Sequence, residues 1–134
     1  MEILKPIIAV FFCIILSASL TMAGGKDRLE LVKDDNGKEV TVQKGGIIEI
    51  RLEEPGATGY SWEVMDLDQS RLELLDSEST PKNQSGNLVG GPVLKKWRFK
   101  AVNAGTTNLK LVLYRVWEGP DKAADRFQVR ISIL

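Results

Sequence analysis

Apolar and polar residues alternate in several short runs along this chain. In the last run, every second residue from Phe127 to Ile133 is apolar and the residues between them are polar. A period of two residues is typical of a β-strand that buries one face. Patterns of this kind predict further strands at 29–32, 40–42, 48–52, 61–65, 72–75, 97–101 and 109–114.

Turn-forming residues separate these runs. Asn36-Gly37 lies between the first two, and this pair is a strong signal for a β-hairpin. The segment 77–91 is polar and rich in glycine, so we expect it to be the longest irregular stretch. Trp62 starts a short strand and is expected in the core. Short alternating strands without helical periodicity predict an all-β fold, an immunoglobulin-like antiparallel β-sandwich.

The first 23 residues have a different character. Lys5 precedes an apolar run from Ile7 to Leu16, and small residues then lead to Ala23. This order is typical of a secretory signal peptide, whereas the apolar run is too short for a comfortable membrane span. We expect a signal peptide at 1–23, cleavage after Ala23, and one secreted or periplasmic domain at 24–134. An uncleaved anchor is the alternative.

Composition narrows the chemistry of the mature domain. The only cysteine, Cys13, lies in the predicted signal peptide, and the chain has no histidine. Ser-His-Asp and Cys-His catalysis and most zinc or copper sites are therefore excluded. Eighteen basic and eighteen acidic residues balance, so the chain has no excess of positive charge that would attract nucleic acid. We expect that the protein is not an enzyme, that it binds no cofactor or metal, and that it has no stable membrane association after cleavage.

The segment Glu-Pro-Gly-Ala-Thr-Gly-Tyr-Ser-Trp follows the strand predicted at 48–52. Pro55 restricts its own backbone, and Gly56 and Gly59 permit positive φ angles, so the chain can leave one strand sharply and enter the next. Ala57 and Thr58 are small enough to allow another molecule to approach, and Thr58 provides a hydroxyl. These features favour a binding loop, although a decorated hairpin turn is the plainer alternative.

A second loop, around Trp117, joins the last two predicted strands. Gly119 and Pro120 follow it and should turn the chain outward. An exposed Trp beside Arg115 is typical of an interface anchor, and the alternative is a Trp117 folded back onto the core. Because a sandwich gathers alternate loops at one end, we expect the loops at 54–60, 86–92 and 115–120 to lie side by side.

Three motifs in these loops resemble the chagasin family of cysteine peptidase inhibitors. They are Pro-x-x-Thr-Gly-Tyr-x-Trp from Pro55, the pair Gly90-Gly91, and Tyr-x-x-Trp-x-Gly-Pro from Tyr114, followed by Arg126-Phe127. The resemblance covers essentially the whole mature domain. It implies a reversible and non-covalent inhibitor whose partner is a papain-like cysteine peptidase. The three loops would fill the active-site cleft of that peptidase. Nothing in the sequence demands a dimer, so we expect a monomer.

The resemblance also implies roles for single residues. Thr58 and Gly59 would lie nearest the catalytic thiol of the peptidase, and Tyr60 would brace their loop. Trp117 would pack beside the catalytic histidine, with Arg115 fixing the orientation by hydrogen bonds. The other expected contact residues are Pro55, Gly56 and Ala57 in the first loop, and Leu88, Val89, Gly90 and Gly91 in the glycine loop.

The chain departs from the family pattern at Glu54, Ala57, Leu88-Val89 and Val116. Val116 replaces a proline that would order the loop before binding, so we expect weaker inhibition or a different target peptidase. Two other classes of protein remain open. An extracytoplasmic immunoglobulin-like adhesion or ligand-binding module would carry exposed aromatic residues on a sheet face. A purely structural domain would bury Trp117.

Overall fold

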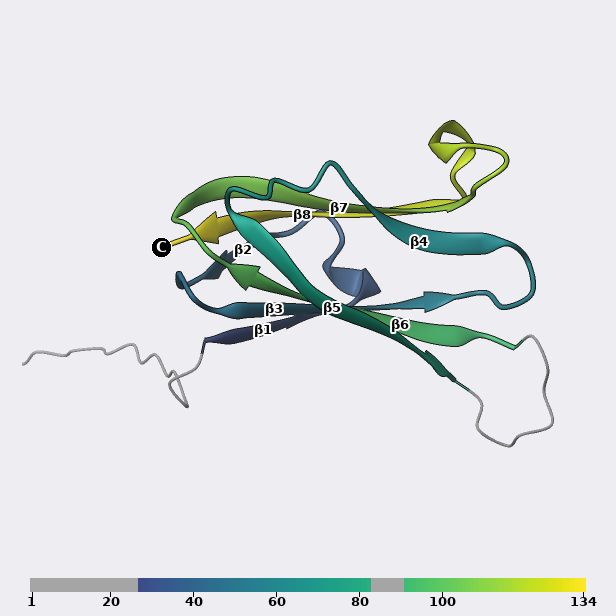
Figure 1. The fold of residues 1–134 in the computed structure, drawn as a ribbon, viewed down its shortest axis with the longest axis horizontal. Coiled ribbons are helices and arrows are strands. Elements are labelled where there is room, and N and C mark those ends of the chain that lie inside the picture. The colour runs from purple at the N-terminus through teal and green to yellow at the C-terminus, as the bar shows by residue number, and fades with distance from the viewer. Residues whose placement is uncertain (1–26, 83–90) are drawn as a thin grey trace, which may run out of the picture.

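The computed structural model describes residues 27–82 and 91–134 (Figure 1). In these residues eight strands form two four-stranded sheets, ordered β1-β3-β6-β5 and β2-β8-β7-β4. The predicted immunoglobulin-like sandwich is confirmed. The elements are β1 (Arg28–Leu31), η1 (Lys33–Asp35), β2 (Glu39–Val42), β3 (Ile47–Glu54), β4 (Tyr60–Met65), β5 (Leu72–Pro81), β6 (Val93–Ala101), β7 (Gly105–Arg115), η2 (Pro120–Lys122) and β8 (Asp125–Ile133), where η marks a short 3-10 helix.

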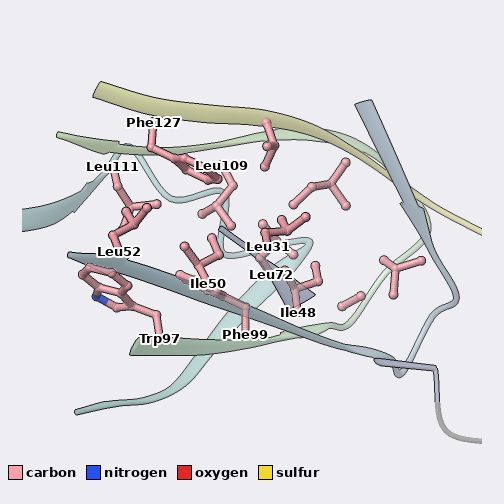
Figure 2. Packing of buried hydrophobic residues seen from close by; sticks show 14 of the residues in the cluster. Leu31, Ile48, Ile50, Leu52, Leu72, Trp97, Phe99, Leu109, Leu111 and Phe127 are labelled. Carbon is pink, nitrogen blue, oxygen red and sulfur yellow. The ribbon is translucent and has the colours of Figure 1, made fainter. Parts of the chain in front are cut away.

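The core lies between the two sheets. Figure 2 shows Ile50 and Leu52 of one sheet directed toward Leu111 and Phe127 of the other. The alternating pattern is confirmed here, because the apolar positions of β3, β6, β7 and β8 face inward and exclude water. The buried cluster consists of Leu31, Val42, Ile48, Ile50, Leu52, Trp62, Leu72, Trp97, Phe99, Ala101, Leu109, Leu111, Leu113, Phe127, Val129, Ile131 and Ile133.

The hairpin predicted at Asn36-Gly37 is wrong. Strand β1 pairs in parallel with β3, and β2 pairs in parallel with β8, so the two strands belong to different sheets. The turn residues bind β8 instead: Gln128 N donates to Asn36 Oδ1 (2.8 Å), and Gly37 N donates to Gln128 O (2.7 Å). The Asn-Gly pair therefore lies where the chain crosses from one sheet to the other. Two of the six pairings between described strands are parallel, so the antiparallel prediction is wrong for these two.

Strand β5 is longer than predicted. It continues beyond Leu75 to Pro81 and pairs with β6 as far as Val93. The apolar pattern misses this part because β5 is an edge strand with almost all of its residues exposed. A bulge between Leu74 and Asp76 also breaks the alternation. Residues 77–81, which were expected to be irregular, therefore belong to this strand.

The outer face of the first sheet contains a buried carboxylate. The alternation of β3 places Glu49 on the polar face, yet the residue is only 1% exposed. Arg28 Nη2 donates to Glu49 Oε1 and Arg51 Nε donates to Oε2, both at 2.7 Å. Burial alone raises the pKa of Glu49, but these hydrogen bonds outweigh it and hold the pKa below its ordinary value. Glu49 therefore remains charged and ties β1 to β3.

Several predictions fall outside the described residues. They concern the signal peptide at 1–23 and the glycine-loop residues Leu88, Val89 and Gly90. Within 27–82 and 91–134, no helix has both the length and the apolar character that a membrane crossing requires.

Candidate functional site

The segment 55–59 crosses the end of the sandwich. It leaves β3 in the first sheet and enters β4 in the second, so it is not the hairpin turn of the plainer alternative. Its start lies next to the start of β6, because Glu54 pairs with Val93, and its end lies next to the end of β7, because Tyr60 pairs with Arg115. The segments 55–59 and 115–120 and the described residues that border the glycine loop, Lys82 and Pro92, therefore lie at the same end of the sandwich (Figure 1).

Buried Trp62 holds the base of this crossing. Its indole Nε1 donates to Glu53 O and its backbone N donates to a carboxylate oxygen of Glu54, both at 2.9 Å. The side chain of Glu53 pairs with Lys82, whose backbone N donates to Pro92 O at 3.0 Å. These contacts connect the bases of the first loop and the glycine loop. The burial predicted for Trp62 is confirmed, at 2% exposure.

Thr58 organises the segment from within. Its hydroxyl donates to Pro55 O (3.2 Å) and accepts from Tyr60 N (3.3 Å). Positive φ angles occur at Ala57 (57°) and Gly59 (85°) but not at Gly56. An alanine therefore adopts a left-handed conformation that glycine would adopt more easily. The hydroxyl expected to be free for a partner therefore already makes two long hydrogen bonds inside its own loop.

Trp117 is exposed in a tight turn at the end of β7. Glu118 N and Gly119 N both donate to Arg115 O, at 2.9 and 3.0 Å. The turn leaves Trp117 70% exposed and its neighbour Val116 72% exposed. The predicted exposure is confirmed, and the alternative in which Trp117 covers the core is wrong. The hypothesis of a purely structural domain requires a buried Trp117, so it loses its main support.

Trp117 also lies against Gly59. A Cβ atom built on Gly59 would be 2.2 Å from Trp117 Cη2, far inside the contact distance of two carbon atoms. With φ at 85°, Gly59 has a conformation that other residues adopt at a cost. Glycine at position 59 is therefore what allows the indole to approach the first loop.

Arg115 joins the two loops. Its Nε donates to Thr58 O at 3.0 Å, and its guanidinium lies 4.3 Å from the centre of the Tyr60 ring. The same group is 5.8 Å from the Trp117 ring and pairs with Glu118 at 3.5 Å. The sequence signals the two loops separately but not this contact, because Arg115 and Thr58 are 57 positions apart.

The structure brings together most of the residues expected to contact a peptidase. Pro55 to Tyr60, Arg115 and Trp117 lie at one end of the sandwich, and Gly91 borders the glycine loop, whose other expected contacts are outside the described residues. Among the described residues, the strongly exposed aromatic side chain is at this loop end and not on a sheet face. Sequence reasoning missed the roles of Glu53 and Glu54 as anchors for Trp62.

Comparisons with known proteins agree with this geometry. Residues 41–131 match the family model described as chagasin family peptidase inhibitor I42. Chagasin of Trypanosoma cruzi is 26% identical over 105 residues, which are 77% of this chain and 96% of chagasin. A crystal structure of a cysteine protease inhibitor from Entamoeba histolytica superposes with a TM-score of 0.75 at 20% identity, over 84% of this chain and 100% of that one. PbICP-C, in complex with falcipain-2, gives a TM-score of 0.50 at 20% identity, over 82% and 100%.

Proposed function

Because the chain belongs to the chagasin family of peptidase inhibitors, we propose that it blocks papain-like cysteine peptidases by inserting its loop end into their active-site cleft. Inhibition, not catalysis, is the activity of this family. The Entamoeba histolytica protein of the same fold is a cysteine protease inhibitor, and PbICP-C was solved in complex with falcipain-2. These relatives support a cysteine peptidase of the papain type as the partner.

The observation that carries the proposal is the exposed Trp117 packed against Gly59 on a rigid frame. A large aromatic side chain that is already held in place loses little conformational entropy on binding. Beside it, Thr58 and Gly59 present a small side chain and bare backbone, which can approach a catalytic thiol closely. No nucleophile of the inhibitor is needed, so the complex is reversible.

The frame also explains how the inserted loop resists cleavage. The ends of segment 55–59 belong to different sheets, and Trp62 bonds to both Glu53 and Glu54 across its base. A cut in the loop would leave both new ends held by these contacts. The peptidase would therefore retain its inhibitor, and the broken bond could be closed again.

The proposed site of action lies outside the cytoplasm. An N-terminal signal peptide at 1–23, with an inhibitor domain at 24–134, would direct the protein to the periplasm or the medium. Expression of the full chain in an exporting host, followed by N-terminal sequencing, should yield a protein that starts at Gly24. Retention of the first 23 residues would favour an anchored form.

Titration of papain and a cathepsin L-type peptidase tests the inhibition. We expect tight, reversible inhibition by the protein, a loss of about 30-fold or more for Trp117→Ala, and a similar or larger loss for Thr58→Arg. Thr41→Arg provides the matched control, because Thr41 is exposed on β2 and outside the proposed contact residues. No inhibition by folded protein at micromolar concentration would contradict the proposal and favour a binding module for other ligands.

A further inference from the structure

Two segments must act together at the loop end although they leave the frame from different strands. Segment 55–59 joins β3 to β4, and segment 116–119 follows β7. Val116 is the second residue of its turn, a position where proline would restrict the backbone before binding. This chain has valine there, so the order of the second segment depends more on the contacts it makes with the first.

Arg115 makes such contacts. Its Nε bond to Thr58 O, its stacking on Tyr60 and its ion pair with Glu118 use both the edge and the face of the guanidinium. Only 32% of the side chain remains exposed. A charged donor on a backbone carbonyl forms one of the stronger hydrogen bonds, and a stacked guanidinium adds a cation–π contact. The Nε donor and one face of the guanidinium are therefore engaged within this protein, and Nη1 pairs with Glu118.

We propose that Arg115 is a positioning residue that acts through its own loops and not through contact with the peptidase. It holds segment 116–119 against Thr58 and thereby keeps the indole of Trp117 on Gly59 before any partner arrives. This inference rests on the proposed function and specifies how the site is prepared. It differs from the role implied by the family resemblance, in which Arg115 orients Trp117 within the complex.

The energetic consequence is a difference in population. If only a fraction of the molecules hold the two loops together, the apparent inhibition constant rises by the inverse of that fraction. The association rate falls by the same factor, whereas the dissociation rate stays unchanged because the bound complex is the same. A direct contact with the peptidase behaves in the opposite way, since its loss mainly accelerates dissociation.

The test compares Arg115→Lys with Arg130→Lys, both in the purified protein that starts at Gly24. Lysine keeps the positive charge but lacks the planar group that binds Thr58 O and stacks on Tyr60. Arg130 is an exposed arginine of β8 that lies 3.7 Å from Glu39, so its replacement controls for the chemistry of the substitution. Thermal melts establish that each variant is folded.

The first readout needs no peptidase. The ring current of Trp117 should displace the proton resonances of Gly59 in the nuclear magnetic resonance spectrum of the free protein. We expect Arg115→Lys to move these resonances toward ordinary glycine values and Arg130→Lys to leave them unchanged. Unchanged Gly59 resonances in a folded Arg115→Lys protein would overturn the proposal.

The second readout is inhibition kinetics with papain. We expect Arg115→Lys to slow association by up to about tenfold, the limit for a charged hydrogen bond worth about 1.5 kcal/mol, with dissociation unchanged. Faster dissociation with unaltered association would overturn the proposal and place Arg115 in contact with the peptidase. If the parent inhibits no peptidase, the proposed function fails, but the Gly59 resonances still decide whether Arg115 joins the loops.

Discussion

Two tryptophans border the same loop and serve different purposes. Trp62 is 2% exposed, and its indole N–H bonds to Glu53 O beneath segment 55–59. Trp117 is 70% exposed and lies against Gly59 on the same segment. One side chain stabilises the frame from inside the core, and the other leaves apolar surface exposed, which we propose contacts the peptidase. The comparison shows that the frame and the proposed binding surface are separate, although their residues are close neighbours.

Trp62→Ala should have the largest effect. Removing a large aromatic side chain from the core costs about 3 to 5 kcal/mol in the free energy of unfolding, which urea denaturation would measure. Trp62→Phe keeps most of the ring but removes the donor to Glu53 O, so it should cost about 1 to 3 kcal/mol. A loss below 1 kcal/mol for both variants would break the distinction between the two tryptophans.

Glu49→Gln should weaken the frame without altering the loop end. The change leaves Arg28 and Arg51 without their buried carboxylate and should cost about 1 to 3 kcal/mol in the free energy of unfolding at pH 7. Because the pKa of Glu49 is lowered on folding, its charge stabilises the native state above the ordinary carboxyl pKa of 4.5. This contribution is lost as the pH falls through the lower, folded value.

Urea denaturation at pH 7 and pH 3 checks this dependence. The difference in stability between the parent and Glu49→Gln should be larger at pH 7 than at pH 3. Inhibition at pH 7 should be equal for the two proteins, since Glu49 is on the outer face of the first sheet. A constant difference in stability at both pH values would contradict the assignment of the charged state.

Gly59→Ala should weaken inhibition. The added methyl group displaces Trp117, and alanine pays about 1 to 2 kcal/mol for the left-handed conformation, which together predict a loss of about tenfold or more. Gly37→Ala is the matched control, because its φ is 87° and no atom lies within 4 Å of the added Cβ. It should lose similar stability and keep full inhibition. Equal inhibition by both variants would show that the Trp117 contact does not matter.

Val116→Pro should have the smallest effect, in the favourable direction. Val116 follows the end of β7, and Arg115 before it is part of that strand, so the extended backbone that precedes a proline is already present. Restricting the free loop by about 0.4 to 1 kcal/mol should tighten inhibition about two- to fivefold in the papain titration. Weaker inhibition by a folded variant would mean that the side chain or the N–H of Val116 is used in the complex.

Much of the frame follows from the sequence. The alternation in β3, β6, β7 and β8 predicts these strands, because every second side chain in each of them faces one shared core. The motifs around Thr58 and Trp117 likewise indicate the family, which the family model confirms, and they predict the two proposed binding loops. The length of β5 and the pairing of β1 with β2 were predicted wrongly. Edge strands and crossings carry little periodic signal, since few of their side chains are buried.

The sequence by itself therefore determined the sandwich and the buried position of Trp62, and it favoured an exposed Trp117. Only the tertiary structure decided that Glu49 is buried beneath two arginines and that Arg115 bonds to Thr58. The physical reason lies in the range of the interactions. A period of two residues is set by the local geometry of a strand, whereas an ion pair or a loop contact depends on segments brought together from distant parts of the chain.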